Sequence, residues 1–226
     1  MNDKKKKILL VGMCLALAVY VLLFFGGGLK NEIAAVKAYD SQNEKPTYFV
    51  YFSGIGCPHC AKTSPVLLKY KVRHSNIMVF EYEIYQSRIN APIIAKYAKA
   101  YDSGMSVPML IINKDNIIDG AKPILVSLNE IIDKHQGNNI LLPNANVSLE
   151  ELNLADMSGL PRIWYKDRIA IREHESQASE EIKAFLIEGE VPKNAISIKP
   201  KTVKISGDEV EFKNAHQFNG WLLMWN

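Results

Sequence analysis

The chain has 226 residues and a formal net charge of +3, and 48% of its residues are hydrophobic while 23% are charged. This composition excludes collagen-like, low-complexity and wholly disordered chains, and the length allows one medium domain or two small ones. Five lysines and one aspartate give residues 1–30 a net charge of +4, so the rest of the chain is close to neutral. Because the chain lacks the basic patch of a nucleic-acid binder, we expect no nucleic-acid partner.

Residues 1–28 are predicted to form a cytoplasmic lysine tail and a transmembrane anchor. The segment 8–25 is a run of 18 residues without a charge, just long enough to cross a bilayer as a helix. Lys4–Lys7 precede it directly, and by the positive-inside rule they keep the N-terminus in the cytoplasm. We therefore expect a single-pass protein of the cell membrane, with the residues after the anchor on the extracytoplasmic side. A cleaved signal peptide is the alternative, and it leads to the same side.

Residues 29–46 are predicted to be a stalk, and residues 47–137 an α/β domain. The β-branched and aromatic run at 47–52 is typical of a strand, and a helix is expected to begin at the cysteine motif that follows it. Further strands are predicted at 77–84, 107–112 and 117–118, and further helices at 90–101 and 123–135. The order β-α-β-α-β-β-α predicts a mixed sheet flanked by helices.

After residue 137 the pattern weakens, and residues 138–226 are predicted to be a linker and a small α+β extension. A hairpin is expected at 160–171, a helix at 175–186, and short strands at 196–198, 203–205, 209–212 and 221–224. We expect this accessory module to dock a partner or to shield the functional site.

The motif Cys57-Pro58-His59-Cys60 carries the clearest chemical signal in the chain. A Cys-x-x-Cys pair is either half of a zinc site or a redox pair, and a structural zinc site needs four ligands. The third cysteine, Cys14, lies in the apolar run, and no second pair of cysteines or histidines has the spacing of zinc ligands. We therefore expect no metal and no cofactor, and we interpret the pair as a redox dithiol.

The thiolate is the nucleophile of disulfide exchange, and the predicted start of the helix stabilises it at Cys57. Pro58 fits the first helical turn, where its missing N–H has no cost. His59 can donate to the thiolate or place a positive charge beside it. Cys60 follows one turn later, where it can resolve a mixed disulfide on Cys57. A stabilised thiolate favours the reduced pair, which makes the disulfide a stronger oxidant.

These residues resemble a known family. Residues 47–137 are similar to a thioredoxin-fold domain, and the Cys-Pro-His-Cys motif matches the dithiol of DsbA-like periplasmic disulfide oxidases. Ser106-Val107-Pro108 resembles the cis-proline loop of the same family. The resemblance implies that Pro108 is cis, that it lies against the dithiol, and that Val107 pairs its backbone with a substrate strand.

Two features depart from the family. DsbA-like oxidases and thioredoxins often carry a buried acid six residues before the first cysteine, where this chain has Tyr51. Glu81 and Glu83 on the next strand are alternatives, but we expect them to be solvated carboxylates at a sheet edge. The interval between Ile84 and Val107 is also too short for the helical insertion of DsbA-like oxidases.

The sequence thus predicts an extracytoplasmic, membrane-tethered thiol-disulfide oxidoreductase that exchanges disulfides with protein substrates. One membrane span with one cysteine offers no electron conduit, so a separate membrane redox partner is expected to recycle the dithiol. The direction of exchange stays open, although Cys-Pro-His-Cys favours oxidation. The alternative is a redox-inactive thioredoxin-fold scaffold for binding or assembly at the membrane, which would not need an intact dithiol.

Overall fold

The computed structural model describes residues 46–134, 140–142, 145–146, 151–174, 177–205 and 207–226. The predicted lysine tail, the predicted span 8–25 and all but the last residue of the stalk lie outside these residues. Among the helices that are described, none combines the length and the apolar character needed to cross a bilayer.

The first part of the described chain alternates strands and helices. In chain order it contains Thr47–Ser53 (β1), Pro58–Arg73 (α2), Ile77–Glu83 (β2), Ala91–Tyr101 (α3), Met109–Asn113 (β3), Asn116–Asp119 (β4) and Ala121–Lys134 (α4). This is the predicted order, with ends shifted by a few residues. Strand β1 pairs in parallel with β2 and antiparallel with β3, and β3 pairs antiparallel with β4.

The remaining elements form a second series dominated by strands. They are Ile140–Leu142 (β5), Ala145–Asn146 (β6), Leu154–Asp156 (η1, a 3₁₀ turn), Arg162–Tyr165 (β7), Arg168–Arg172 (β8), Ser179–Glu188 (α5), Ile196–Ile198 (β9), Lys201–Ile205 (β10), Asp208–Phe212 (β11), Asn214–Phe218 (β12) and Trp221–Trp225 (β13). The hairpin, the helix and the four short strands predicted for this region are present. Strands β5 and β6 were not predicted, because they lie in the stretch interpreted as a linker. Strand β12 was not predicted either, because its sequence NAHQF is mostly polar and lacks a regular alternation.

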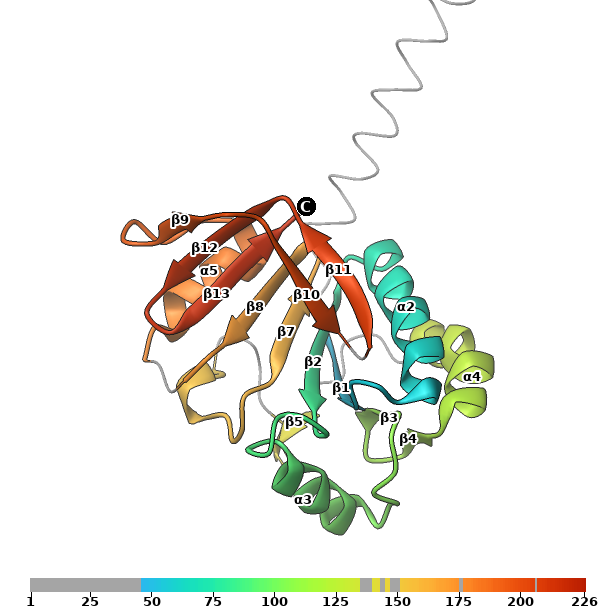
Figure 1. The fold of residues 1–226 in the computed structure, drawn as a ribbon. Coiled ribbons are helices and arrows are strands. Elements are labelled where there is room, and N and C mark those ends of the chain that lie inside the picture. The colour runs from blue at the N-terminus through green and yellow to red at the C-terminus, as the bar shows by residue number, and fades with distance from the viewer. Residues whose placement is uncertain (1–45, 135–139, 143–144, 147–150, 175–176, 206) are drawn as a thin grey trace, which may run out of the picture. The chain divides into compact units, whose positions relative to one another are not determined.

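Nine of the described strands form one mixed sheet in the order β4-β3-β1-β2-β7-β8-β13-β12-β9 (Figure 1). The pairing that joins its two parts is antiparallel, between β2 and β7. Strand β2 therefore lies inside the sheet, and all seven of its residues are buried. The domain boundary at residue 137 stays a prediction, while the sheet itself continues from one side of it to the other.

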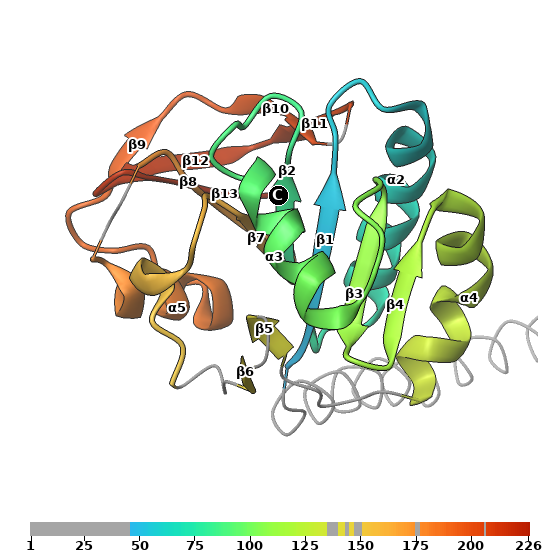
Figure 2. The same ribbon diagram turned by 90° about the horizontal axis from the view of Figure 1, so that it is seen from below.

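Two apolar cores lie on opposite faces of the sheet, because alternate residues of a strand point to opposite sides. Phe52 of β1 packs in the core that includes Tyr97 of α3 and Phe185 of α5. Phe49 of β1 packs in the core that includes Leu67 of α2 and that extends to α4 and to the β10–β11 hairpin. Figure 2 shows α3 and α5 on one side of the sheet and α2 and α4 on the other.

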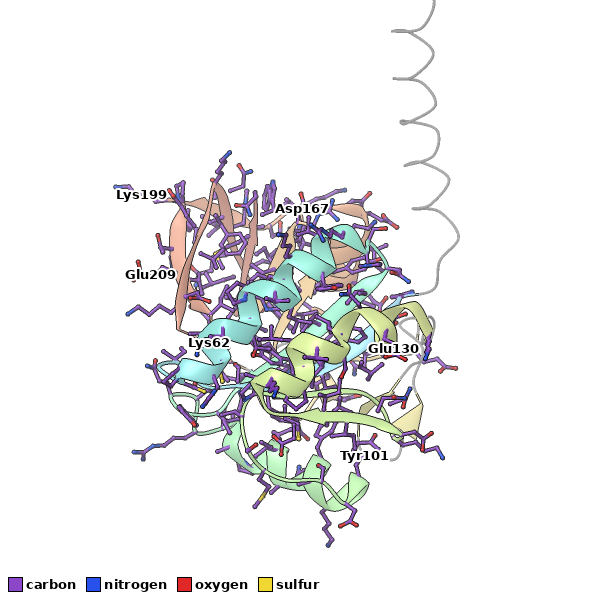
Figure 3. The ribbon with its side chains drawn as sticks, turned by 90° about the vertical axis from the view of Figure 1, so that its right-hand side faces the viewer. Lys62, Tyr101, Glu130, Asp167, Lys199 and Glu209 are labelled. Carbon is purple, nitrogen blue, oxygen red and sulfur yellow. The ribbon has the colours of Figure 1, made fainter. Side chains whose placement is uncertain are left out.

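The hairpin of β10 and β11 forms a separate two-stranded sheet beside α2 (Figure 1). Ile205 and Phe212 on its inner side are buried, and the Phe212 ring lies 6.1 Å from the ring of Trp164 in β7. Helix α2 thus has α4 on one flank and this hairpin on the other. Figure 3 views the face that α2 and α4 cover, with Lys62 on α2 and Glu130 on α4.

Candidate active site

The cysteine motif begins α2 directly after a glycine turn. Strand β1 ends at Ser53, and Gly56 has a φ of +86°, which favours glycine. Cys57 is the N-cap residue of α2, with its amide donating to the Gly54 carbonyl at 3.0 Å. Pro58 occupies the first turn of the helix, as predicted. The chain therefore turns sharply from the sheet into the helix at the first cysteine.

The two sulfur atoms lie together at this helix terminus. Both cysteines are free thiols, and their Sγ atoms are 2.8 Å apart. The Cys57 Sγ accepts a hydrogen bond from the Cys60 amide at 3.2 Å, so one of the unpaired N–H groups of the first turn points at this sulfur. Cys57 is 5% exposed and Cys60 is not exposed at all. Cys57 is thus the sulfur that an incoming group meets first.

The loop before β3 lies against the same sulfur. The Val107–Pro108 peptide bond is cis, and the Cys57 thiol donates to the Val107 carbonyl at 3.8 Å. The loop is held at its base, because the Gly120 amide donates to the Pro108 carbonyl at 2.9 Å and the Ser106 hydroxyl bonds the carboxylate of Asp119. The structure therefore brings the Val107 carbonyl to Cys57, next to Pro108 in the chain, and the substrate-binding role of both residues stays a prediction.

His59 lies between the cysteines in the chain, and its side chain is exposed. Its carbonyl accepts from the Thr63 hydroxyl at 3.0 Å, but its imidazole makes no hydrogen bond within the described part of the chain. The tuning role of His59 stays a prediction.

The expectation that Glu81 and Glu83 are solvated edge carboxylates is wrong, because both residues are only 2% exposed. The β2–β7 pairing reaches Glu81 and covers the side of β2 that the prediction left open. Glu83 lies beyond that pairing, and the turn at Ile55 and the loop 85–87 enclose it. Buried carboxylates need hydrogen-bonded partners, and both have them.

Glu81 pairs in register with Tyr51 on β1, the position at which the family that the sequence resembles often carries a buried acid. The Ser53 hydroxyl donates to its Oε1 at 2.7 Å, and the Trp164 indole N–H donates to its Oε2 at 3.1 Å. Arg162 Nη1 lies 3.7 Å from the same Oε2. The carboxylate is thus held by Ser53 of β1 on one side and by Trp164 and Arg162 of β7 on the other.

A small cavity of about 10 Å³ lies under α2 and is lined in part by Tyr51, Ser64, Glu81 and Trp164. Its size is close to that of a single water molecule. Tyr51 and Ser64 share a hydrogen bond of 2.9 Å at its wall. Burial raises the pKa of the Tyr51 hydroxyl, so this group stays protonated at neutral pH.

Cys60 is chemically distinct from Cys57. Burial raises the pKa of the Cys60 thiol, and the hydrogen bond to Cys57 and the negative charge of Glu81 raise it further. Cys60 therefore holds its proton at neutral pH and needs a nearby acceptor before it can act as a nucleophile.

Two further segments flank the site. A β-carbon at Gly207, in the turn of the β10–β11 hairpin, would lie 3.6 Å from the Gly56 nitrogen and 3.9 Å from the Ala61 Cβ. A β-carbon at Gly54 would lie 2.6 Å from the ring of Tyr85, which is 57% exposed. Each glycine permits a close approach, so the hairpin turn and Tyr85 both lie beside the turn that leads into Cys57.

Sequence reasoning missed Arg162 and Trp164, which connect the second part of the chain to Glu81. No local pattern marks them, because their contacts with Glu81 join residues 81 and 83 positions apart. Ser53 was also missed, although a serine at the end of an apolar strand directly before the motif is a usable signal. Within the described residues, no group of three or more His, Cys, Asp or Glu side chains is arranged to hold a metal ion.

Comparison of the chain with models of protein families, with curated proteins and with solved structures gives no match.

Proposed function

We propose that this protein is a thiol-disulfide oxidoreductase whose residues 47–137 adopt a thioredoxin-like fold. The observation that carries the proposal is the placement of Cys57. Its sulfur accepts a hydrogen bond from the Cys60 amide at the start of α2 and lies 3.8 Å from the Val107 carbonyl. The strand order β4-β3-β1-β2 supports it as well, with only β3 antiparallel to its neighbours.

In the oxidising direction a substrate thiolate attacks the Cys57 sulfur of the Cys57–Cys60 disulfide. The bond between the cysteines breaks, Cys60 leaves as a thiolate and takes a proton, and the substrate forms a mixed disulfide with Cys57. A second substrate thiolate then attacks the substrate sulfur of that mixed disulfide and releases Cys57. The substrate loses two electrons and two protons, and the dithiol gains them.

In the reducing direction the Cys57 thiolate attacks a substrate disulfide, and Cys60 must lose its proton to attack the mixed disulfide. Glu81 is the acceptor that the geometry favours, because it is buried beside the dithiol and its charge acts on Cys60. The cavity that Tyr51, Ser64 and Glu81 help to line has room for about one water molecule beside this carboxylate. Neither direction requires a metal or an organic cofactor.

The proposed location is the outer face of a cell membrane, with residues 8–25 as the anchor. The support is the uncharged run and the lysines before it. Protein thiols and disulfides are the proposed substrates, and a separate membrane redox partner is proposed to exchange electrons with the Cys57–Cys60 pair.

Exchange with a protein disulfide such as insulin tests the proposal in the full-length chain. We expect turnover in the wild type, none in Cys57→Ser, and a trapped mixed disulfide with substrate in Cys60→Ala. Cys14→Ser is the matched control and should exchange as the wild type does, because Cys14 belongs to the apolar run. No turnover by the wild type, together with no trapped partner in Cys60→Ala, would instead support the scaffold alternative.

A further inference from the structure

Glu83, the last residue of β2, joins two loops through backbone amides. Its Oε1 accepts from the amides of Ile55 and Tyr85, each at 2.9 Å. Its Oε2 accepts from the amides of Gln86 at 3.0 Å and Ser87 at 2.8 Å. One carboxylate thus binds the turn before the first cysteine and the loop after β2.

These donors explain how a carboxylate that is 2% exposed is tolerated at this position. Glu83 makes no ion pair within the described residues, so the four amides stabilise its negative charge in place of a basic side chain. A carboxylate has about four lone-pair directions, and hydrogen bonds to a charged acceptor are roughly twice as strong as neutral ones. A glutamine has one acceptor oxygen and cannot satisfy all four donors.

The first loop leads directly into the dithiol. Ile55 is two residues before Cys57, and the Gly54 carbonyl accepts the Cys57 amide at 3.0 Å. The second loop carries Tyr85, whose ring lies against Gly54 on the exposed side of that turn. A shift of either loop would therefore move the N-cap at which the Cys60 amide holds the Cys57 sulfur.

We propose that Glu83 is a positioning residue for the redox reaction: it fixes the 54–56 turn and the 85–87 loop, and through them the geometry that stabilises the Cys57 thiolate. This role rests on the proposed function and is distinct from that of Glu81, which is placed to accept a proton. The charge of Glu83 and its hydrogen bonds to the two loops have opposite effects on the Cys57 thiolate. The negative charge disfavours the thiolate, whereas the hydrogen bonds hold the geometry that favours it.

Two variants of the full-length chain separate these effects. Glu83→Asp keeps the charge but is one methylene too short to reach both loops, and Glu83→Gln keeps the length but loses the charge. Glu130→Gln is the matched control, because Glu130 is an exposed carboxylate on α4 that pairs with Lys134 (Figure 3).

Hydrogen exchange read by mass spectrometry on peptides spanning 53–57 and 84–88 reports the loops, and the alkylation rate of Cys57 at pH 7 reports its thiolate. We expect Glu83→Asp to lose amide protection in both peptides together and to alkylate about tenfold more slowly, because the thiolate is the form that reacts. The equilibrium with glutathione should shift several-fold toward the disulfide. Glu83→Gln should lose the same protection with a smaller fall in rate, and Glu130→Gln should change neither.

Two outcomes overturn the proposal: protection that persists in both variants, or protection that is lost while the alkylation rate and the glutathione equilibrium of Glu83→Asp stay within twofold of wild type. If neither variant folds, the wild type decides. Slow exchange shared by all four amides supports the role of Glu83, and fast exchange at Ile55 beside a protected Ser87 contradicts it. A wild-type protein without any disulfide exchange would contradict the proposed function instead. The amide protection would still show whether Glu83 holds the two loops.

Discussion

The two cysteines of the motif have different surroundings, and this difference assigns their roles. The Cys57 sulfur accepts a hydrogen bond from the Cys60 amide, and Cys57 is the one of the two cysteines that is slightly exposed. The Cys60 sulfur is fully buried, and burial raises the pKa of its thiol. Under the proposed function the first attack falls on Cys57, and resolution by Cys60 depends on the removal of its proton.

Replacement of Glu81 by glutamine tests the proton acceptor. We expect the mixed disulfide on Cys57 to persist about a hundredfold longer at pH 7, at the low end of what general base catalysis contributes. The effect should shrink as pH rises, because hydroxide then removes the Cys60 proton directly. Quenched single-turnover reactions measure the lifetime. An unchanged lifetime at pH 7 would exclude Glu81 as the acceptor.

The dithiol itself could be predicted from residues alone, because a Cys-x-x-Cys pair between a strand and a helix is a local pattern. The burial of Glu81 and Glu83 could not, because it depends on the pairing of β7 with β2 for Glu81 and on the approach of the Ile55 turn for Glu83. Residue type favoured exposure for both carboxylates, and tertiary pairing reversed it.

At the scale of elements, the β10–β11 hairpin is the part of the second series that reaches the site. Its inner side chains pack over α2 and Trp164, and its turn lies beside Gly56. A two-stranded hairpin is marginal by itself in water, so this packing holds it in place.

Phe212→Ala should detach the hairpin from Trp164. We expect the free energy of unfolding to fall by about 3 kcal/mol, because a fully buried aromatic ring is lost and the hairpin can collapse only in part. Urea unfolding measures the change. Glu211→Ala is the control on the same strand, and its exposed side chain should contribute little. A loss below about 1 kcal/mol for Phe212→Ala would mean that the hairpin does not pack there in solution.

The order of elements up to residue 134 follows from periodicity and turn residues, and the structure confirms it. The place of the later strands does not follow, since hairpins of similar pattern can extend a sheet or form a sheet of their own. Here β7 and β8 extend the main sheet, while β10 and β11 stay separate. No short-range signal in the two hairpins distinguishes these outcomes.

At the scale of the whole molecule, Lys71 ties the end of α2 to the second series. Its ammonium donates to the Lys166 carbonyl between β7 and β8 and lies 5.7 Å from the centroid of the Trp164 ring. Burial lowers the pKa of Lys71 from 10.5 to about 8. The folded chain therefore releases this proton at a lower pH than the unfolded chain does.

This difference predicts a pH dependence of stability. Between about pH 8 and 10 the unfolded chain binds more protons than the folded one, so stability rises with pH, by at most about 1.4 kcal/mol per unit. Above this window the buried tyrosines Tyr82 and Tyr97, whose pKa values burial raises, act in the opposite sense. Denaturant unfolding at several pH values should show the rise in wild type and in the exposed control Lys69→Met. A rise of equal size in Lys71→Met would contradict the assignment.

The equilibrium of the Cys57–Cys60 pair with glutathione is the measurement that tests the central claim most directly. We expect the pair in the full-length chain to equilibrate readily, with a reduction potential above about −200 mV and toward the value of about −120 mV of strong oxidants. A potential near −270 mV, about that of thioredoxin, would still support an oxidoreductase, but one that reduces its substrates instead of oxidising them. A pair that does not exchange, or one below about −300 mV as in structural disulfides, would contradict the account.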